Sequence, residues 1–294
     1  MRSAAFACGL SILMACSAHA DGVSTTISSA KPGPSGWQFN FTPYGWLTWV
    51  DGNATVRGRD FSVQQNPGQV LSDLEGVWMS YMEAKRGAIT LFSDVIYADI
   101  GNSSSFARSR SVTPHINGSV GGAVRSDYSF WIVEAGFMYE TNRYKWGNSS
   151  AETDTTLDLL MGLRYWHQDL DVNLSLAGNA NIDGLVVSGA GAWARSGSVS
   201  WVDLFMGARL THTPTPGHEL ALRGDFGGFG WGSQFTWQLI GTYSAYLGSH
   251  SGIDFNSYLG YKALSVDYDQ GVGHRRYEFD VIQHGPVIGL TGKF

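Results

Sequence analysis

Four charged residues have a spacing that could place two acid–base pairs inside one protein wall. Asp158 and Arg164 lie in one segment of alternating polarity, and Asp203 and Arg209 lie in another. In a pair of neighbouring antiparallel strands, the numbers of opposite residues have a constant sum. Asp158 with Arg209 and Arg164 with Asp203 give the same sum, so a single register would oppose both acids to both bases. The sequence therefore predicts an ion-pair belt between these segments.

Further charges fall on the same side of other segments. The short connection after residues 199–212 brings Arg209 near Arg223, with Asp225 one pleat further along. The belt therefore spans residues 154–229, and the other charges assigned to the lumen are Glu83, Glu134, Asp94 and Lys262. Charges held in a confined interior must be paired, because desolvating an unpaired charge is very costly.

Long strands are needed to position these residues. About ten segments alternate with the two-residue period of a strand. They cover residues 37–49, 76–86, 88–100, 124–140, 154–166, 199–212, 219–229, 234–247, 253–266 and a closing segment after the loop 267–276. Residues 154–166 show the alternation most clearly, with Leu157 to Tyr165 on one side and Asp158 and Arg164 on the other.

The connections between these segments fall into two sets. Long polar stretches follow three odd-numbered segments, and mostly short turns, including 141–153, follow the even-numbered ones. The long stretches are 51–75, with two short β-like pieces and one or two helical turns; 101–123; and 167–198, with a ribbon of its own. This asymmetry is typical of bacterial barrels, which have long extracellular loops and short periplasmic turns. We predict an all-β fold, a transmembrane antiparallel up-and-down β-barrel of about ten strands, with 8 or 12 as alternatives. A soluble β-sandwich would have shorter strands with polar outer faces.

The two ends of the chain fit export to an outer membrane. Arg2, an apolar run and Ala18-His19-Ala20 indicate a signal peptide cleaved after Ala20; a lipoprotein signal ending at Cys16 is the alternative. We expect residues 1–20 to be this signal, 21–35 a disordered periplasmic lead-in and 36–294 the barrel. The last strand has an uncharged face that includes Ile288, Leu290 and Phe294, and a terminal aromatic residue is similar to the assembly signal of such barrels.

Composition excludes several other classes. Both cysteines, Cys8 and Cys16, lie in the predicted signal peptide, so the exported chain is not a disulfide scaffold. The formal net charge of −6 gives no basic surface for nucleic acid. A mean hydropathy of −0.10 with 15% charged residues is too polar for a helical membrane protein and low in charge for a soluble one.

In a narrow barrel, the predicted belt has two possible roles. It could plug and stiffen the lumen, or it could line a passage for a small polar solute. Small barrels tend to be filled by side chains, which favours the plug.

Four residues near the predicted outer rim superficially resemble the acidic and histidine set of the omptin proteases, which are ten-stranded barrels. They are His167, Asp169, Asp267 and Asp269. Strand parity argues against catalysis, because His167, Asp169 and Asp267 continue lipid-facing sides and would point outward. The alternative is that the aspartates face lipopolysaccharide headgroups, through divalent cations. We assign no catalytic residue.

The remaining histidines form no metal-ligand spacing, and no cofactor motif is present, so neither a metal nor a cofactor is expected. The orientation of His284 is left open, because a bulge at Gly285-Pro286 would turn its side chain from the lipid to the lumen.

Several segments, taken in order, resemble a little-characterised family of proteobacterial outer-membrane β-barrel proteins. They are Pro43–Leu47, Leu71–Glu75, Leu91–Asp99, Gly162–Trp166, Trp201–Arg209, Gly224–Gln238, Gly260–Gly271 and the terminal HGPVIGLTGKF. The resemblance implies a fold and an outer-membrane location, and no catalytic residues.

Together these observations predict an integral outer-membrane barrel that serves as a narrow polar-solute passage or a structural surface component. The alternatives are a rim-active enzyme and a ligand or adhesion surface built from the long loops. The expected partners are outer-membrane lipid and lipopolysaccharide, the barrel-assembly machinery and periplasmic chaperones.

Overall fold

The computed structural model describes residues 36–56, 59–113, 116–146, 153–182 and 185–294. The predicted signal peptide and lead-in lie outside these ranges. The strands are β1 (Gln38–Trp46), β2 (Trp49–Val56), β3 (Arg59–Gln65), β4 (Leu74–Arg86), β5 (Ile89–Thr113), β6 (Ile116–Trp146), β7 (Thr153–Ile182), β8 (Leu185–Thr215), β9 (His218–Gly228), β10 (Phe235–His250), β11 (Ile253–Gln270) and β12 (Tyr277–Lys293). A helix α1 (Pro67–Asp73) precedes β4, and a short 3₁₀ helix η1 (Gly273–Arg275) precedes β12.

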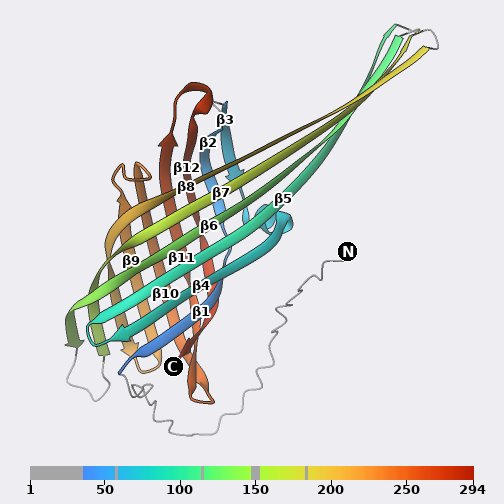
Figure 1. Cartoon of the computed structure of the whole chain (residues 1–294). Coiled ribbons are helices and arrows are strands. Elements are labelled where there is room, and N and C mark those ends of the chain that lie inside the picture. The colour runs from blue at the N-terminus through green and yellow to red at the C-terminus, as the bar shows by residue number, and fades with distance from the viewer. Residues whose placement is uncertain (1–35, 57–58, 114–115, 147–152, 183–184) are drawn as a thin grey trace.

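Strands β1 and β2 are two parts of one wall strand. Both pair with β12, and the register on either side of the interruption is the same, with Trp46 opposite Val287 and Trp49 opposite His284. The interruption faces Pro286, which has no N–H to donate to the ladder. Counting β1 and β2 together, the sheet is a ring of about ten antiparallel strands (Figure 1), as predicted.

The ring closes between the two ends of the chain. β1 pairs with β4 from Gln38 to Pro43 and with β12 on its other side. The Phe294 N–H donates to the Phe39 carbonyl oxygen at 2.8 Å. Beyond Pro43 the same wall strand no longer pairs with β4. Its continuation, β2, pairs with β3 to form a hairpin, and α1 connects β3 to β4. The expected seal between the closing strand and the first strand is confirmed.

The predicted loops 101–123 and 167–198 are wrong: most of their residues are strand. β5, β6, β7 and β8 are 25, 31, 30 and 31 residues long. They leave the barrel together as a long four-stranded sheet, which Figure 1 shows at the upper right. We call this sheet the arm, residues 101–113, 116–127, 171–182 and 185–196. Gly and Ser suggested loops, but ladder hydrogen bonds come from the backbone and need no apolar side chain.

Other connections are closer to expectation. The predicted β-like pieces and helical turns of 51–75 correspond to β2, β3 and α1. Asn66 caps α1, with its side chain accepting from the Gln69 N–H at 3.0 Å. The predicted turn 141–153 begins instead as strand, because β6 continues to Trp146.

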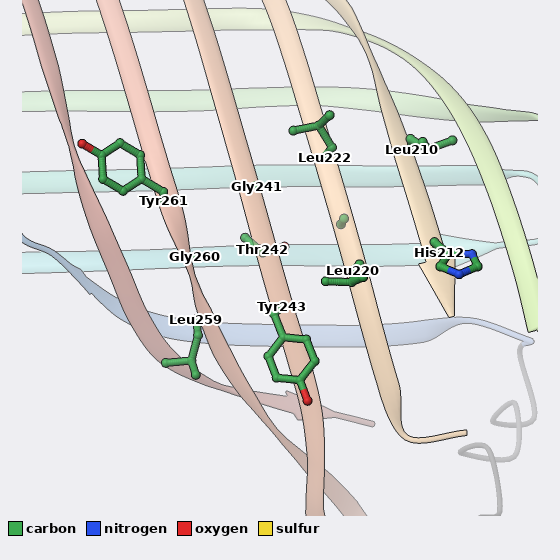
Figure 2. A pocket seen from close by; sticks show the side chains of 11 residues that line it. Leu210, His212, Leu220, Leu222, Gly241, Thr242, Tyr243, Leu259, Gly260 and Tyr261 are labelled. Atoms are coloured by element: carbon green, nitrogen blue, oxygen red, sulfur yellow. The ribbon is translucent and has the colours of Figure 1, made fainter. Parts of the chain in front are cut away.

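The barrel is apolar outside and mixed inside. Large apolar side chains are exposed on the outer wall, among them Leu163, Phe226, Leu239 and Ile288. Outward aromatic rings near the arm end of the barrel include Tyr97 and Trp131, whose ring centroids are 4.5 Å apart. On the half of the barrel away from the arm, Gly241 and Gly260 carry no side chain, and a shallow apolar groove runs there over the outer surface of β8–β11 (Figure 2). Among the described residues, no helix has the length and apolar character needed to cross a membrane.

Candidate functional site in the barrel lumen

At mid-height the lumen contains a closed arrangement of two arginines and two carboxylates. Glu134 accepts from Arg164 Nε at 2.9 Å and from Arg223 Nη2 at 2.8 Å. Asp225 accepts from Arg164 Nη2 at 2.7 Å and from Arg223 Nε at 3.0 Å. All four side chains are buried. Each acid therefore contacts both bases, and the local charge is balanced without water.

Phenylalanine rings lie against the guanidinium groups of this ion-pair square. The Cζ atom of Arg164 is 4.8 Å from the Phe205 ring centroid, and that of Arg223 is 4.8 Å from the Phe92 ring centroid. A guanidinium over an aromatic face gains a cation–π attraction that strengthens when water is excluded. The rings thus stabilise the charges and occupy lumen space beside them.

Two further charged groups flank the square. Lys262 Nζ lies 2.8 Å from Asp94 Oδ2 and 5.1 Å from the Trp46 ring centroid. The Tyr44 hydroxyl donates to the other Asp94 oxygen at 2.7 Å. Asp94 lies on β5, and its two partners lie on β1 and β11, which flank the closing strand β12. These bonds therefore link strands on both sides of the closure of the ring.

Arg209 forms a second charged contact toward the short turns at the end of the barrel away from the arm. It lies 3.0 Å from Asp158 and also pairs with Glu83. Glu83 in turn accepts from the Tyr81 hydroxyl at 2.7 Å and from Asn40 at 3.3 Å. The sequence places Glu83 in the lumen as well, whereas sequence reasoning missed Tyr81 and Tyr44, although their strand parity places them on the same side as the assigned charges.

The predicted register between β7 and β8 is confirmed, with Asp158 opposite Arg209 and Arg164 opposite Asp203. The first couple forms an ion pair. The second does not: Arg164 binds Glu134, its opposite residue on the other neighbouring strand β6, and Asp225 on β9, so the expected Arg164–Asp203 pairing is wrong. Backbone register fixes which Cα atoms oppose, whereas a long arginine side chain can select partners on other strands.

Asp203 instead holds the turn between β9 and β10. One carboxylate oxygen accepts from the Ser233 N–H at 2.7 Å and from the Ser233 hydroxyl at 2.8 Å. The other accepts from Trp201 Nε1 at 3.2 Å. The turn contains Phe229 at φ 53°, a conformation that costs energy for a non-glycine residue. Asp203 therefore holds a strained turn over the barrel mouth.

We expect Asp203→Ala to destabilise the protein by about 1–3 kcal/mol, because three buried donors lose their acceptor. The free energy of unfolding, measured by urea denaturation in detergent, checks this expectation. Asp203→Asn keeps an acceptor oxygen for Ser233 and should lose less. If both variants lost the same free energy of unfolding, the negative charge of Asp203, and not its hydrogen bonds to the turn, would be the source of the stabilisation.

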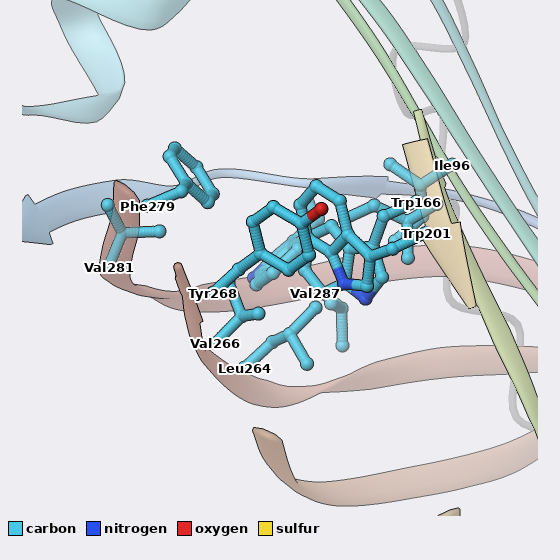
Figure 3. Close-up of a cluster of buried hydrophobic side chains, with 11 residues drawn as sticks. Ile96, Trp166, Trp201, Leu264, Val266, Tyr268, Phe279, Val281 and Val287 are labelled. Carbon is cyan, nitrogen blue, oxygen red and sulfur yellow. The ribbon is translucent and has the colours of Figure 1, made fainter. Parts of the chain in front are cut away.

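Toward the outer end, aromatic and aliphatic side chains fill the lumen (Figure 3). Trp201 stacks between two neighbours: its ring centroid is 3.9 Å from that of Tyr268 and 5.5 Å from that of Trp166. Further members of this aromatic layer are Trp46, Ile96, Ile132, Leu264, Val266, Phe279, Val281 and Val287. Sequence reasoning missed this layer, although Trp166 shares the parity of Arg164 and so belongs to the lumen.

These layers show what the lumen is able to do. The described side chains at its charged levels are engaged in ion pairs or hydrogen bonds, and the aromatic layer lies above them. Such an arrangement links side chains from several strands of the wall and leaves the charged groups buried.

The four rim residues lie on the outer surface and form two separate groups. His167 is two residues from Asp169, with His167 Nε2 2.8 Å from Asp169 Oδ2, and it stacks on Tyr165. Asp269 pairs with Arg276 at 3.2 Å. In the described ladders, β7 and β11 are separated by β8, β9 and β10, so these two groups do not meet.

Asp267 lies near the end of β11, opposite Asp280. Burial raises the pKa of the Asp267 carboxyl, and the charges of Asp280, Glu278 and Asp269 raise it further. A carboxyl whose pKa is higher in the folded state than in the unfolded state costs stability when both states are ionised. This cost is absent below the unfolded pKa and is fully present above the folded pKa.

We therefore expect Asp267→Asn to stabilise the protein at pH 7 by a few tenths of a kcal/mol, as is typical of screened surface charges. At about pH 3, below the ordinary aspartate pKa, the difference from the wild type should vanish. Urea unfolding at the two pH values measures it. If Asp267→Asn raised the free energy of unfolding equally at both pH values, the charge of Asp267 would not be the cause of the gain.

His284 points outward, which settles the question left open by the sequence. The β11–β12 register continues without a shift through Gly285 and Pro286, so there is no bulge. The His284 ring stacks on Trp49, and its Nδ1 atom is 2.6 Å from the Tyr261 hydroxyl oxygen. Gly285 is needed there, since a Cβ atom would lie 1.8 Å from the Leu47 carbonyl oxygen.

No group of three or more candidate metal ligands occurs in the part of the chain that the structure describes. Ile288, Leu290 and Phe294, the predicted assembly signal, lie exposed on the outer wall. Their role in assembly stays a prediction.

The fold thus defines an antiparallel β-barrel with an apolar exterior and a filled, charged lumen. No protein-family model and no curated protein matches the chain.

Three solved structures illustrate its structural neighbours. Ail of Yersinia pestis, in complex with the heparin analogue sucrose octasulfate, has a TM-score of 0.32 and 12% identity over 88% of this chain and 99% of Ail. The translocator domain of NalP from Neisseria meningitidis has a TM-score of 0.26 and 8% identity, covering 88% of this chain and 89% of that domain. A Pseudomonas aeruginosa FadL homologue has a TM-score of 0.24 and 8% identity, with the same two coverages. At such scores these likenesses carry no conclusion about what this chain binds.

Proposed function

We propose that this chain is an integral outer-membrane protein whose closed barrel anchors a rigid surface structure, the arm. One observation supports this most directly: β5 to β8 run without a break from a filled barrel into the arm. The ladders hold the arm at a fixed position relative to the wall. A flexible loop could not be held in this way.

The location in an outer membrane is supported by the distribution of polarity. Large apolar side chains face outward around the wall, while the charged residues of the belt are buried inside. A closed barrel satisfies its backbone groups within the wall, as hydrocarbon requires. Export by a signal peptide cleaved after Ala20, assembly by the barrel-assembly machinery and periplasmic chaperones, and contact with lipopolysaccharide all belong to this proposal.

The filled lumen favours the structural role over the polar-solute passage. In planar bilayers we expect the purified wild-type protein to give no single-channel current, with a known porin as the positive control. Regular, voltage-stable current steps from the intact protein would overturn the closed anchor.

Display of the arm has its own test. The exported chain is expected to lack cysteine, so a single introduced cysteine can be labelled cleanly. Ser175→Cys, exposed in the arm, should react with a membrane-impermeant maleimide on intact cells. Glu219→Cys, at a position whose side chain is 42% exposed near the opposite end of the barrel, should react only after the outer membrane is permeabilised. Reversed labelling would place the arm in the periplasm and contradict the proposal.

A further inference from the structure

One face of the arm is apolar and uncovered. On β6 and β7, Val124 lies opposite Leu174, Gly122 opposite Leu176 and Val120 opposite Gly178. Val120 and Leu176 are 44% and 39% exposed. We call Val120, Val124, Val172, Leu174 and Leu176 the apolar face of the arm.

The opposite face of the same strands is polar. Ser119 and Asn179 are hydrogen-bonded across the ladder at 2.5 Å, and Arg125 pairs with Asp127 at 3.0 Å. Asn173 and Ser175, which alternate with the apolar residues of β7, are exposed. The arm is therefore an amphipathic sheet. Such a sheet ordinarily buries its apolar face against another layer.

Within the described residues, no second layer covers this face, and both edges of the arm are unpaired. The β4–β5 ladder ends at Ile100, and the β8–β9 ladder begins at Phe205. In the arm, β5 pairs only with β6, and β8 pairs only with β7. The layer that covers the apolar face must come from outside the described arm.

We propose that the covering layer is the arm of a second copy of this chain, packed face to face across a two-fold axis. This inference rests on the proposed function. Barrels anchored in one membrane hold their arms at the same height, and two copies then approach each other only within the plane of the membrane. A two-fold contact is isologous, so each apolar face meets its equivalent. The described side chains of this face on the two central strands, β6 and β7, are uncharged. The ladders place Arg108 of β5 opposite Val120 and Arg195 of β8 opposite Val172, on the edge strands. Two such faces would bury an apolar centre and keep their charges at the rim, the usual arrangement of an interface.

The area of the arm is sufficient for such a dimer. With strands about 4.8 Å apart and about 3.3 Å per residue, four strands of about ten residues present roughly 600 Å². Two arms packed about 10 Å apart, as in a β-sandwich, would bury on the order of 1,200 Å². This value reaches the lower limit of stable, specific interfaces.

Neighbouring residues of β7 provide a matched test. Leu174→Asp places a charge on the apolar face, and Asn173→Asp places the same charge on the polar face. By light scattering or sedimentation of the detergent-solubilised full chain, we expect a wild-type dimer. Leu174→Asp should weaken dimerisation by at least on the order of 100-fold, because it buries an unpaired charge. Asn173→Asp should remain dimeric.

A second measurement locates the contact. Pyrene attached at Leu176→Cys should give excimer fluorescence in membrane vesicles, whereas pyrene at Ala177→Cys, on the other face, should not. A monomeric wild type, equal effects of the two aspartates, or excimer at position 177 alone would overturn the proposal. If the protein is a monomer and an apolar ligand or the membrane surface shields Leu176, then that ligand or surface, and not a second arm, covers the apolar face.

The two proposals fail in different ways. Maleimide labelling of Ser175→Cys reports display of the arm whether or not the protein dimerises. A labelled arm on a monomeric protein would reject only the dimer. A dimer with an unlabelled arm on intact cells would reject only the surface location.

Discussion

Arg164→Ala is expected to destabilise the barrel by about 3–5 kcal/mol, the usual cost of removing one partner from a buried ion pair. Arg164 is fully buried and contacts both Glu134 and Asp225. Its removal leaves Arg223 as the only cation of the ion-pair square and leaves a cavity beside Phe205. Urea unfolding in detergent or lipid vesicles, followed by tryptophan fluorescence, measures the loss.

The chain contains a suitable control for this variant. Arg143 also contacts two carboxylates, those of Glu140 and Asp154, but its side chain is 44% exposed near a turn. Arg143→Ala should cost less than about 1 kcal/mol, because water replaces the lost contacts. If both variants lost the same amount, burial of the square would not be the source of its contribution.

Trp201→Ala is expected to cost about 3–5 kcal/mol, because a large buried aromatic side chain is lost and a cavity remains. Trp201 is 6% exposed and lies between Trp166 and Tyr268. The lost stacking adds to the lost apolar contact. The same urea experiment measures the effect.

Trp231 is the matched control, being 80% exposed on the turn that Asp203 holds. Trp231→Ala should change the free energy of unfolding by roughly 0.5 kcal/mol or less. Neither tryptophan variant should conduct ions, since the ion-pair square is intact in both. Single-channel current from Trp201→Ala alone would show that the aromatic layer is the sole closure of the lumen.

Strand alternation was sufficient to predict much of the fold. It predicted the ring of about ten strands, the closing strand and the inward face that carries Asp158 and Arg164. Each wall strand separates an apolar exterior from a mixed interior, so its sequence has a period of two. The β7–β8 register followed from two acid–base couples whose residue numbers have the same sum.

The limits of this reasoning are clearest in the arm. Residues 101–123 and 167–198 are rich in small and polar residues, which are typical of loops. Their strands are held by backbone hydrogen bonds to equally long neighbours, and a single segment contains no information about the length of its partners. The apolar residues Val172, Leu174 and Leu176 do alternate, and the ribbon predicted within 167–198 was a partial account of this pattern.

The sequence by itself determined the barrel, its strand parity and which charges enter the lumen, because these depend on local alternation along each strand. Only the tertiary structure decided the partners of those charges. Arg164 passes over Asp203, its opposite residue in the register, and binds Glu134 and Asp225, while Asp203 holds Ser233. Glu134 is the residue opposite Arg164 on its other neighbour, β6, and Asp225 lies two strands away on β9. Each inward side chain therefore has candidate partners on several strands, and three-dimensional proximity, which the sequence does not contain, selects among them.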